Sequence, residues 1–356
     1  MFLPVRTFVR YGYVPVMLLG VNGTGIALAA GGAPKAWLLA LLIVAIALSF
    51  AAERLLPYEN TWNSARGDTR RDTVHTFVNE TLVLAGVLAV PALAALVPGN
   101  GFWPTHWPFV VQVLIAILIA DLGITLTHYA SHKVGLLWRF HAVHHSVTRF
   151  YGLNGLMKHP LHQTIETAAG VTPLLLAGIP VPVAAALSLA VAVQLLLQHS
   201  NADYSVGPLT HVLALNAGHR FHHLKWAGIG DVNFGLFTLT WDHLLGTYRY
   251  DPERRFGSSD LGMAAKPDYP VGYLAQFTEP FTRRGGCEST AAATPETTRR
   301  RRQPSGAPSP DRRSAEIGDI TPASPRRRSS AGSAGPRAAT STPAGTARGR
   351  ERRANP

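Results

Sequence analysis

Long runs of apolar residues alternate with short polar segments over the first two thirds of the chain. Four of these runs approach the roughly 20 residues that an α-helix needs to cross a bilayer, at residues 13–30, 36–52, 81–97 and 109–127. A longer run at residues 171–198 is broken by Gly178, Pro180 and Pro182, which interrupt helical hydrogen bonding. The pattern predicts four membrane spans followed by a hairpin, either two tilted crossings or a re-entrant loop.

Basic residues gather in every second connecting segment. They precede the first run, lie between the second and third, and follow the fourth: Arg6, Arg10, Arg54, Arg66, Arg70, Arg71, Lys133, Arg139, Arg149 and Lys158. Loops rich in Lys and Arg remain in the cytoplasm, so both termini are expected on the cytoplasmic side. The start also resembles a signal peptide. Removing one span would place the basic loops outside, so we expect the first helix to be retained.

Composition supports a membrane location and separates a tail from the rest. Of the 356 residues, 47% are apolar and only 15% are charged, with a net charge of +12. Residues 285–356 hold 14 Arg against 6 acidic residues and therefore carry +8 of this charge. This segment has no aromatic residue and is expected to be disordered. It could touch anionic lipid, but it offers no stacking platform for specific nucleic-acid binding.

The single cysteine, Cys287, lies in that tail. One cysteine excludes an intrachain disulfide framework, CxxC redox chemistry and a cysteine-rich zinc or iron–sulfur site. Any bound metal must therefore be held by nitrogen or oxygen atoms.

Eight of the 15 histidines fall into three spaced clusters. The first is an HxxxH pair at the end of the fourth run, and the other two are HxxHH sequences on either side of the hairpin: His128 and His132; His141, His144 and His145; His219, His222 and His223. Residues three and four apart lie on one face of a helix. All three clusters are expected on the cytoplasmic side, where they would form a histidine-rich helical cap.

Imidazole is a ligand for iron, zinc, copper and nickel, and paired spacing suits two metal ions that each take ligands from several helices. The clusters contain no Asp, Glu or Cys. This argues against the carboxylate-rich di-iron sites of soluble bundles and against HExxH hydrolases. Asp121, the only acidic residue inside a predicted span, is expected to orient a ligand such as His128. Four other histidines are expected to be interfacial or core residues: His75, His106, His162 and His211.

The three clusters in this order, with a membrane hairpin between the second and third, resemble the fatty acid hydroxylase/sterol desaturase superfamily. The resemblance covers about residues 70–248 and includes further short matches. These are Asn154 with His159-Pro160-Leu161, Gln198-His199-Ser200-Asn201, Asn233-Phe234-Gly235, and Trp241 to Tyr248. His243 and His162 depart from the usual family residues. Both departures lie outside the eight clustered histidines, so they concern the substrate subtype rather than the chemistry.

The resemblance implies two iron ions (Fe2+/Fe3+) held by the eight histidines, with His199 and then His159 as candidate additional ligands. It implies supporting roles for Asn201, Asn233 and Asp242. The implied reaction uses O2 to hydroxylate or desaturate a membrane lipid: a fatty acyl chain, sterol, carotenoid or ether lipid. The sequence has no dinucleotide-binding glycine motif, haem-attachment motif or iron–sulfur cysteines, so a separate ferredoxin, cytochrome or reductase must supply electrons.

The sequence thus predicts an all-α, polytopic membrane oxidoreductase. Its expected parts are N-terminal helices at residues 1–69, a catalytic domain at 70–250, an extension of the cap at 251–284 and a disordered tail at 285–356. Two alternatives stay open. A metal-binding or transport protein without redox turnover would take up metal without consuming O2. A membrane zinc hydrolase would need an acid–base carboxylate near the histidines, where Asp231 and Asp242 are the only candidates.

Overall fold

The computed structural model describes residues 3–96 and 101–282 of the chain. Within these residues every regular element is a helix, and backbone pairing between extended segments is limited to two isolated bridges. The all-α prediction is therefore confirmed. The predicted disorder of residues 285–356, together with Cys287, lies outside the described residues.

Five helical segments are long and apolar enough to cross a membrane. The first is one continuous helix made of α1 (Leu3–Pro15), a π-helical turn (Val16–Val21) and α2 (Asn22–Ala30). The others are α3 (Ala36–Leu55), α4 (Thr69–Ala94), α5 (Phe109–Lys133) and α8 (Val181–His199). These segments confirm an integral membrane body.

The helices extend further into polar sequence than the hydropathy of the chain indicated. α4 begins at Thr69, twelve residues before the predicted start, and it therefore contains Glu80. α3 continues past residue 52 and includes Glu53. The longer helices thus include acidic residues besides Asp121, because hydropathy detects the apolar part of a helix and misses polar turns at its end.

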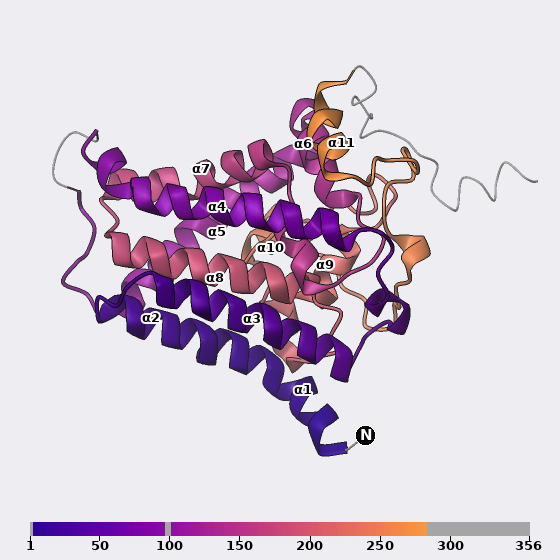
Figure 1. The fold of residues 1–356 in the computed structure, drawn as a ribbon, viewed down its shortest axis with the longest axis horizontal. Helices are drawn as coiled ribbons and strands as arrows, with labels where there is room; N and C mark the ends of the chain where they lie inside the picture. Colours follow the sequence, from indigo (N-terminus) through magenta and orange to yellow (C-terminus); the bar gives the residue numbers. More distant parts are fainter. Residues whose placement is uncertain (1–2, 97–100, 283–356) are drawn as a thin grey trace, which may run out of the picture. The chain divides into compact units, whose positions relative to one another are not determined.

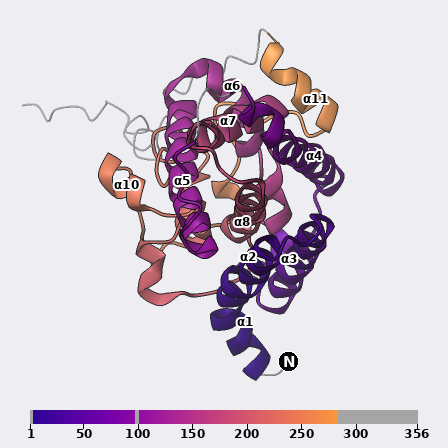
Figure 2. The same cartoon turned by 90° about the vertical axis from the view of Figure 1, so that its left-hand side faces the viewer.

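α7 (Pro160–Ala177) and α8 form the predicted hairpin, and α8 is the central helix of the bundle. The turn between them places Gly178 at φ +82°, in the left-handed region where a residue without a Cβ is favoured. The apolar part of α8 is 78% buried, whereas the other four candidate spans are 17% to 33% buried. Figure 2 shows α8 surrounded by the other long helices, and α2, α3, α4 and α5 each contact it.

Short helices gather at one end of the long ones and form a cap. They are α6 (Gly135–His145), α9 (Asn216–His222), α10 (Thr240–Leu245) and α11 (Tyr273–Thr278), with 3-10 turns between them (Figure 1). The 3-10 turn Gly152–Leu156 lies directly on α8. A Cβ at Gly155 would meet the carbonyl oxygen of Leu195 at 2.2 Å, so only glycine allows this close approach.

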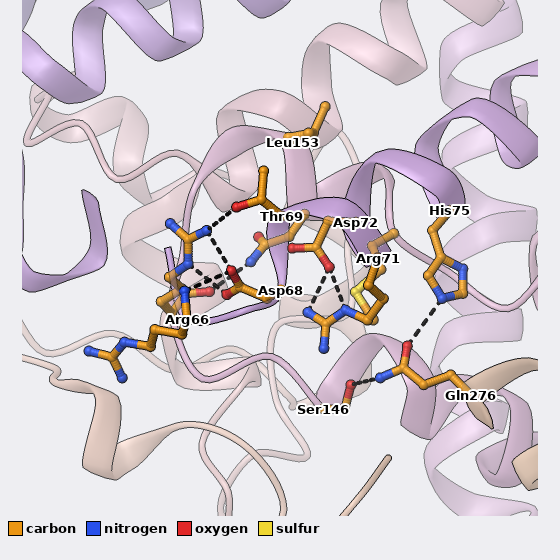
Figure 3. A network of polar contacts seen from close by, with 12 residues as sticks. Arg66, Asp68, Thr69, Arg71, Asp72, His75, Ser146, Leu153 and Gln276 are labelled. Atoms are coloured by element: carbon orange, nitrogen blue, oxygen red, sulfur yellow. Dashed lines mark hydrogen bonds and ion pairs between the residues drawn. The ribbon is translucent and has the colours of Figure 1, made fainter. Parts of the chain in front are cut away.

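Polar contacts connect the start of α4 to the cap (Figure 3). The Arg149 guanidinium donates to both carboxylate oxygens of Asp68, at 2.7 and 2.8 Å. The adjacent Asp72 accepts from Arg71 and from the hydroxyl of Tyr151, each at 2.6 Å. Bidentate pairs of this kind fix orientation as well as distance, so they hold the cap at a defined angle to the membrane helices.

Candidate dinuclear metal site

Nine histidines converge inside the cap and form two adjacent clusters. Within each cluster every residue offers a ring nitrogen that lies within 4.8 Å of the others, and every residue is buried. The five-histidine cluster contains His128, His132, His141, His145 and His222, and the four-histidine cluster contains His144, His199, His219 and His223. All eight clustered histidines of the sequence are thereby brought together, along with His199.

The two HxxHH sequences divide their histidines between the clusters in opposite ways. On α6, the i,i+4 pair His141 and His145 joins the five-histidine cluster, while His144 joins the other. On α9 the i,i+4 pair of residues 219 and 223 joins the four-histidine cluster, while His222 joins the five-histidine cluster. Residues four apart share a helix face, whereas the one between them is turned away. Each short helix therefore contributes to both clusters.

The separations between ring nitrogens match those expected around a metal ion. Two ligands at right angles, each bonded at about 2.1 Å, have nitrogens about 3.0 Å apart. In the structure Nε2 atoms lie 3.0 to 3.2 Å apart in the pairs His132–His145, His141–His145, His199–His219 and His219–His223. The donor set fits two ions that prefer imidazole.

In five of the nine histidines, a protein acceptor receives a hydrogen bond from the second ring nitrogen, Nδ1. A ligating histidine usually donates its other N–H in this way, which sets the tautomer and aims Nε2 at the metal. The acceptors are the carbonyl oxygens of Phe234, Met157 and Val232 for His128, His144 and His222, the Asp231 carboxylate for His132, and the Asn154 amide oxygen for His199, at 2.8 to 3.0 Å.

The opposite nitrogens remain without hydrogen-bond partners in two of these residues. The Nε2 atoms of His128 and His222 are buried and unpaired, which costs free energy unless a ligand occupies the space. Burial also lowers the pKa of the cap histidines from the ordinary value of 6.5, to about 3 for His144 and well below 6.5 for His141, His145, His219, His222 and His223. The imidazoles are therefore neutral and available as metal donors.

Asp231 accepts a hydrogen bond from Nδ1 of His132 at 3.0 Å and pairs with the ammonium of Lys133 at 2.6 Å. Burial alone would raise the pKa of Asp231, but these two donors outweigh it and hold the pKa below the usual range. The carboxylate is thus ionised and makes His132 a stronger donor to metal. Asp231 orients a clustered histidine, which differs from the acid–base role that the hydrolase alternative required.

Asp231→Asn is expected to reduce metal retention and turnover by about 10- to 100-fold, the usual cost of losing an outer-shell partner. The amide removes the negative charge that polarises His132 while keeping the shape of the side chain. Lys133→Met is the matched control, because it breaks the other contact of Asp231 and leaves the bond to His132 intact. Equal metal content in wild type and Asp231→Asn, measured after dialysis against a chelator, would contradict this role.

The backbone that orients His128 is itself held by two buried carboxylates. Asp121 accepts from the amides of residues 236–238 and from the Thr238 hydroxyl, at 2.8 to 3.2 Å. Asp242 accepts from the amides of Phe234 and residue 235 at 2.7 and 2.8 Å. None of these hydrogen bonds joins Asp121 directly to a clustered histidine. It acts one step further out, by fixing the segment whose Phe234 carbonyl receives the His128 hydrogen bond.

Two asparagines that the sequence selected also hold backbone near the clusters. The Asn233 side chain donates to the carbonyls of Gly218 and Arg249, and the first of these bonds positions α9. The backbone of Asn233 has φ +54°. The Asn201 side chain bonds to residues 59 and 63 in the connection that follows α3. Asn233 therefore supports the third histidine cluster, while Asn201 anchors the N-terminal helices to the end of α8.

The remaining histidines lie outside the two clusters. His159 caps α7, accepting from the amide of Leu161, and its Nε2 bonds to the Phe277 carbonyl, so both nitrogens are engaged with backbone. His75 is a buried core residue bonded to the Lys158 carbonyl and to Gln276 (Figure 3). His106 and His211 are exposed. His162 is fully buried, bonds to Ser131 at 2.9 Å, and forms a smaller group with His141 and Glu166.

Reasoning from the sequence did not assign site roles to Asn154, Lys158, Glu166 or the orienting carboxylate of Asp231. Asn154 was part of a family match, but no spacing pointed to its contact with His199. Glu166 does carry a signal, because it lies four residues after His162 on one helix face and could reach the same site. Lys158 and Glu166 form a buried ion pair. Their spacing along the chain does not predict this contact.

Two cavities reach this region from different directions. A small one, about 40 Å³, is lined by His132, His145 and His222 together with Trp138, Trp226 and Lys225, all of them cap residues apart from the end of α5. A larger one, about 450 Å³, lies among α4, α5, α7 and α8 and extends to Lys158 and Glu166. The small cavity therefore reaches three clustered histidines from the cap side, and the larger, apolar cavity ends at the Lys158–Glu166 pair beside the site.

Comparisons with known proteins place the chain among lipid-oxidising enzymes. The fatty acid hydroxylase family model matches residues 113–247. An ornithine lipid hydroxylase from Rhizobium tropici is 35% identical over 258 residues, covering 70% of this chain and 77% of that protein. Alkylglycerol monooxygenases from Danio rerio and Homo sapiens are each 26% identical over 152 residues, which is 43% of this chain and 33% of each relative. No solved structure matches the chain.

Proposed function

This chain belongs to the fatty acid hydroxylase family, and from that premise we propose that it is a membrane enzyme that oxidises a C–H bond of a lipid at a centre of two iron ions, with O2 as co-substrate. The observation that carries the proposal is the pair of buried histidine clusters, whose nine imidazoles present no carboxylate among them. The larger cluster would hold one ion and the smaller cluster the other.

The residues of this chain have definable tasks in the reaction. Bound iron supplies the reduction of O2 and the oxidising power needed for an unactivated C–H bond. The nine histidines hold the ions, and Asp231, Asn154 and the carbonyls of residues 157, 232 and 234 fix the tautomers of five of them. Burial of all nine side chains limits the contact of the centre with bulk water, which protects reactive species from side reactions.

The names of the relatives support a lipid substrate with a polar head group. Their names give an ornithine lipid and an alkylglycerol as substrates. Both have a polar end and long apolar chains, and the cavity among α4, α5, α7 and α8 joins an apolar space to one buried ion pair. Because the alkylglycerol monooxygenases are covered over only a third of their length, the ornithine lipid hydroxylase is the stronger guide to substrate.

We further propose that the cap and both termini face the cytoplasm, on the basis of the basic connecting segments. The small cap cavity then opens toward the cytoplasm and is lined by three clustered histidines. Two tryptophans, Trp138 and Trp226, line it, and Trp138 packs edge-to-face against His132 with ring centroids 5.1 Å apart. A separate ferredoxin, cytochrome or reductase would deliver electrons at this face.

The first test is metal analysis of the detergent-purified protein combined with reductant-dependent O2 uptake. The lipids to supply are an ornithine lipid and an alkylglycerol, with a ferredoxin and its reductase as electron donor. About two irons per chain and lipid-stimulated O2 uptake are expected. Bound metal without O2 uptake in the presence of a competent donor would instead favour the transport or hydrolase alternatives.

A further inference from the structure

The cavity of about 450 Å³ among α4, α5, α7 and α8 has the size and lining of a lipid-binding pocket. Ligand pockets typically measure roughly 300 to 1,000 Å³ and are mostly apolar with a few placed polar groups. Most of its lining side chains are aliphatic, including Val87, Leu174, Ile179 and Leu187. α4 and α5 each contact both α7 and α8, so they form the side walls of the space between the two arms of the hairpin.

The pocket opens sideways toward the lipid between α4 and α7. Among its lining residues, the exposed ones all come from these two helices: Leu82, Gly86 and Leu93 of α4, and Thr164, Ala168 and Thr172 of α7. The lining residues of α5 and α8, such as Ala120 and Leu187, are buried or only partly exposed. A lipid can therefore enter from the bilayer without passing through the cap.

One end of the pocket is polar and adjoins the metal site. Lys158 and Glu166 are the only charged residues in its lining, and they form a buried ion pair. The Glu166 carboxylate also lies within 4.8 Å of ring nitrogens of His141 and His162. Its Oε1 atom is buried without a hydrogen-bond partner, so this end offers an unused acceptor to a polar group from outside.

The other end of the pocket is apolar and lies far from the histidines. Along α7 the lining runs from Gln163 to Leu175 and then to Ile179 in the hairpin turn, whereas the histidine clusters lie in the cap. The 18 residues of α7 correspond to about 27 Å at 1.5 Å per residue. The remote end is therefore separated from the metal site by most of the thickness of a bilayer core, roughly 30 Å.

We propose that the substrate lies in this pocket with its polar head at the Lys158–Glu166 pair and its chain along α7, so that oxidation occurs at a carbon next to the head group and not in the middle of an acyl chain. This inference rests on the proposed function. The C–H bond becomes C–O–H with one oxygen atom of O2, and the other oxygen leaves as water. A protein one-electron donor supplies two electrons, and solvent supplies two protons.

Gly86→Phe tests the occupancy of the pocket. A side chain at residue 86 meets open space, because nothing lies within 4 Å of an added Cβ, so the phenyl ring should fill the pocket without straining the helix. We expect kcat/KM to fall by at least about tenfold for long-chain ornithine lipids or alkylglycerols, as for other pockets that change by a few carbon atoms. Short-chain versions of the same lipids should be affected much less.

Leu88→Phe is the matched control, since Leu88 lies on the same helix, is 59% exposed and does not line the pocket. It should leave the chain-length preference unchanged. Iron content should equal that of wild type in both variants, which separates pocket filling from misfolding. An unaltered chain-length preference in Gly86→Phe would overturn the inference.

Fragmentation mass spectrometry of the wild-type product tests the position of attack independently of any variant. Oxygen on the carbon next to the head group is expected. Oxygen in the middle of a chain would overturn the inference and leave the proposed function standing. Absence of lipid-dependent O2 uptake by the iron-loaded wild-type enzyme would overturn both, so the two failures are distinguishable.

Discussion

Replacing His144 with alanine is expected to abolish lipid-dependent O2 consumption while the protein still inserts into the membrane. Under the proposed assignment, His144 supplies one of four nitrogens in the smaller cluster, and its Nδ1 donates to the Met157 carbonyl at 2.9 Å. Alanine removes the ligand and leaves that buried carbonyl unpaired. Because losing only an outer-shell partner costs up to about 100-fold, losing a ligand should cost more than that.

The measurement is O2 uptake with an ornithine lipid, together with iron content per chain. His106→Ala is the matched control, because His106 is exposed and outside both clusters, and it should behave as wild type. Retention of two irons and full O2 uptake by His144→Ala would remove the dinuclear assignment. Fractionation shows whether the variant is still inserted in the membrane.

Asp121→Ala is expected to cause the largest loss of stability among single changes away from the histidines. The carboxylate receives three backbone amides and the Thr238 hydroxyl in a fully buried setting. An unsatisfied buried group costs about 1 to 3 kcal/mol, so three orphaned amides should lower the free energy of unfolding by at least about 3 kcal/mol. The loss of stability is smallest if water enters the space left by the carboxylate and hydrogen-bonds to the amides.

Thermal unfolding of the detergent-solubilised protein measures this loss of stability. Iron content per chain shows whether the change also weakens metal binding at the histidine clusters. Thr238→Val removes only the side-chain hydrogen bond to Asp121 and should shift the midpoint far less. A melting temperature for Asp121→Ala equal to that of wild type would show that the segment at residues 236–238 is held by other contacts. Lower iron content is expected as well, because the neighbouring Phe234 carbonyl orients His128.

Much of the fold could be predicted because apolar length and helical spacing are local properties. The hairpin break at Gly178 and the grouping of His141 with His145 both follow from a few adjacent residues. Hydropathy could not predict that α4 begins at Thr69 and α7 at Pro160. When hydropathy is averaged over a window of residues, a polar helical turn inside the protein looks the same as a loop. Packing against other parts of the chain decides those boundaries.

The partners of the histidines were less predictable, because they join distant parts of the chain. Asp231 lies 99 residues from His132, and Asn154 lies 45 residues from His199. No local spacing specifies such pairs, and several acceptors are backbone carbonyls, which any residue carries. The division of each HxxHH between two clusters was also not predicted, since the spacing places residues three and four apart on one face of a helix and does not show which cluster each side chain joins.

That division sets an order for assembly during synthesis. The five-histidine cluster is incomplete without His222, and the four-histidine cluster takes three of its members from residues 199–223. A nascent chain that ends after α7 therefore offers four nitrogens of one cluster and one of the other. Neither cluster can reach its full complement of nitrogens until the second arm of the hairpin has inserted and α9 has emerged from the ribosome, so the same late segment of the chain completes both clusters.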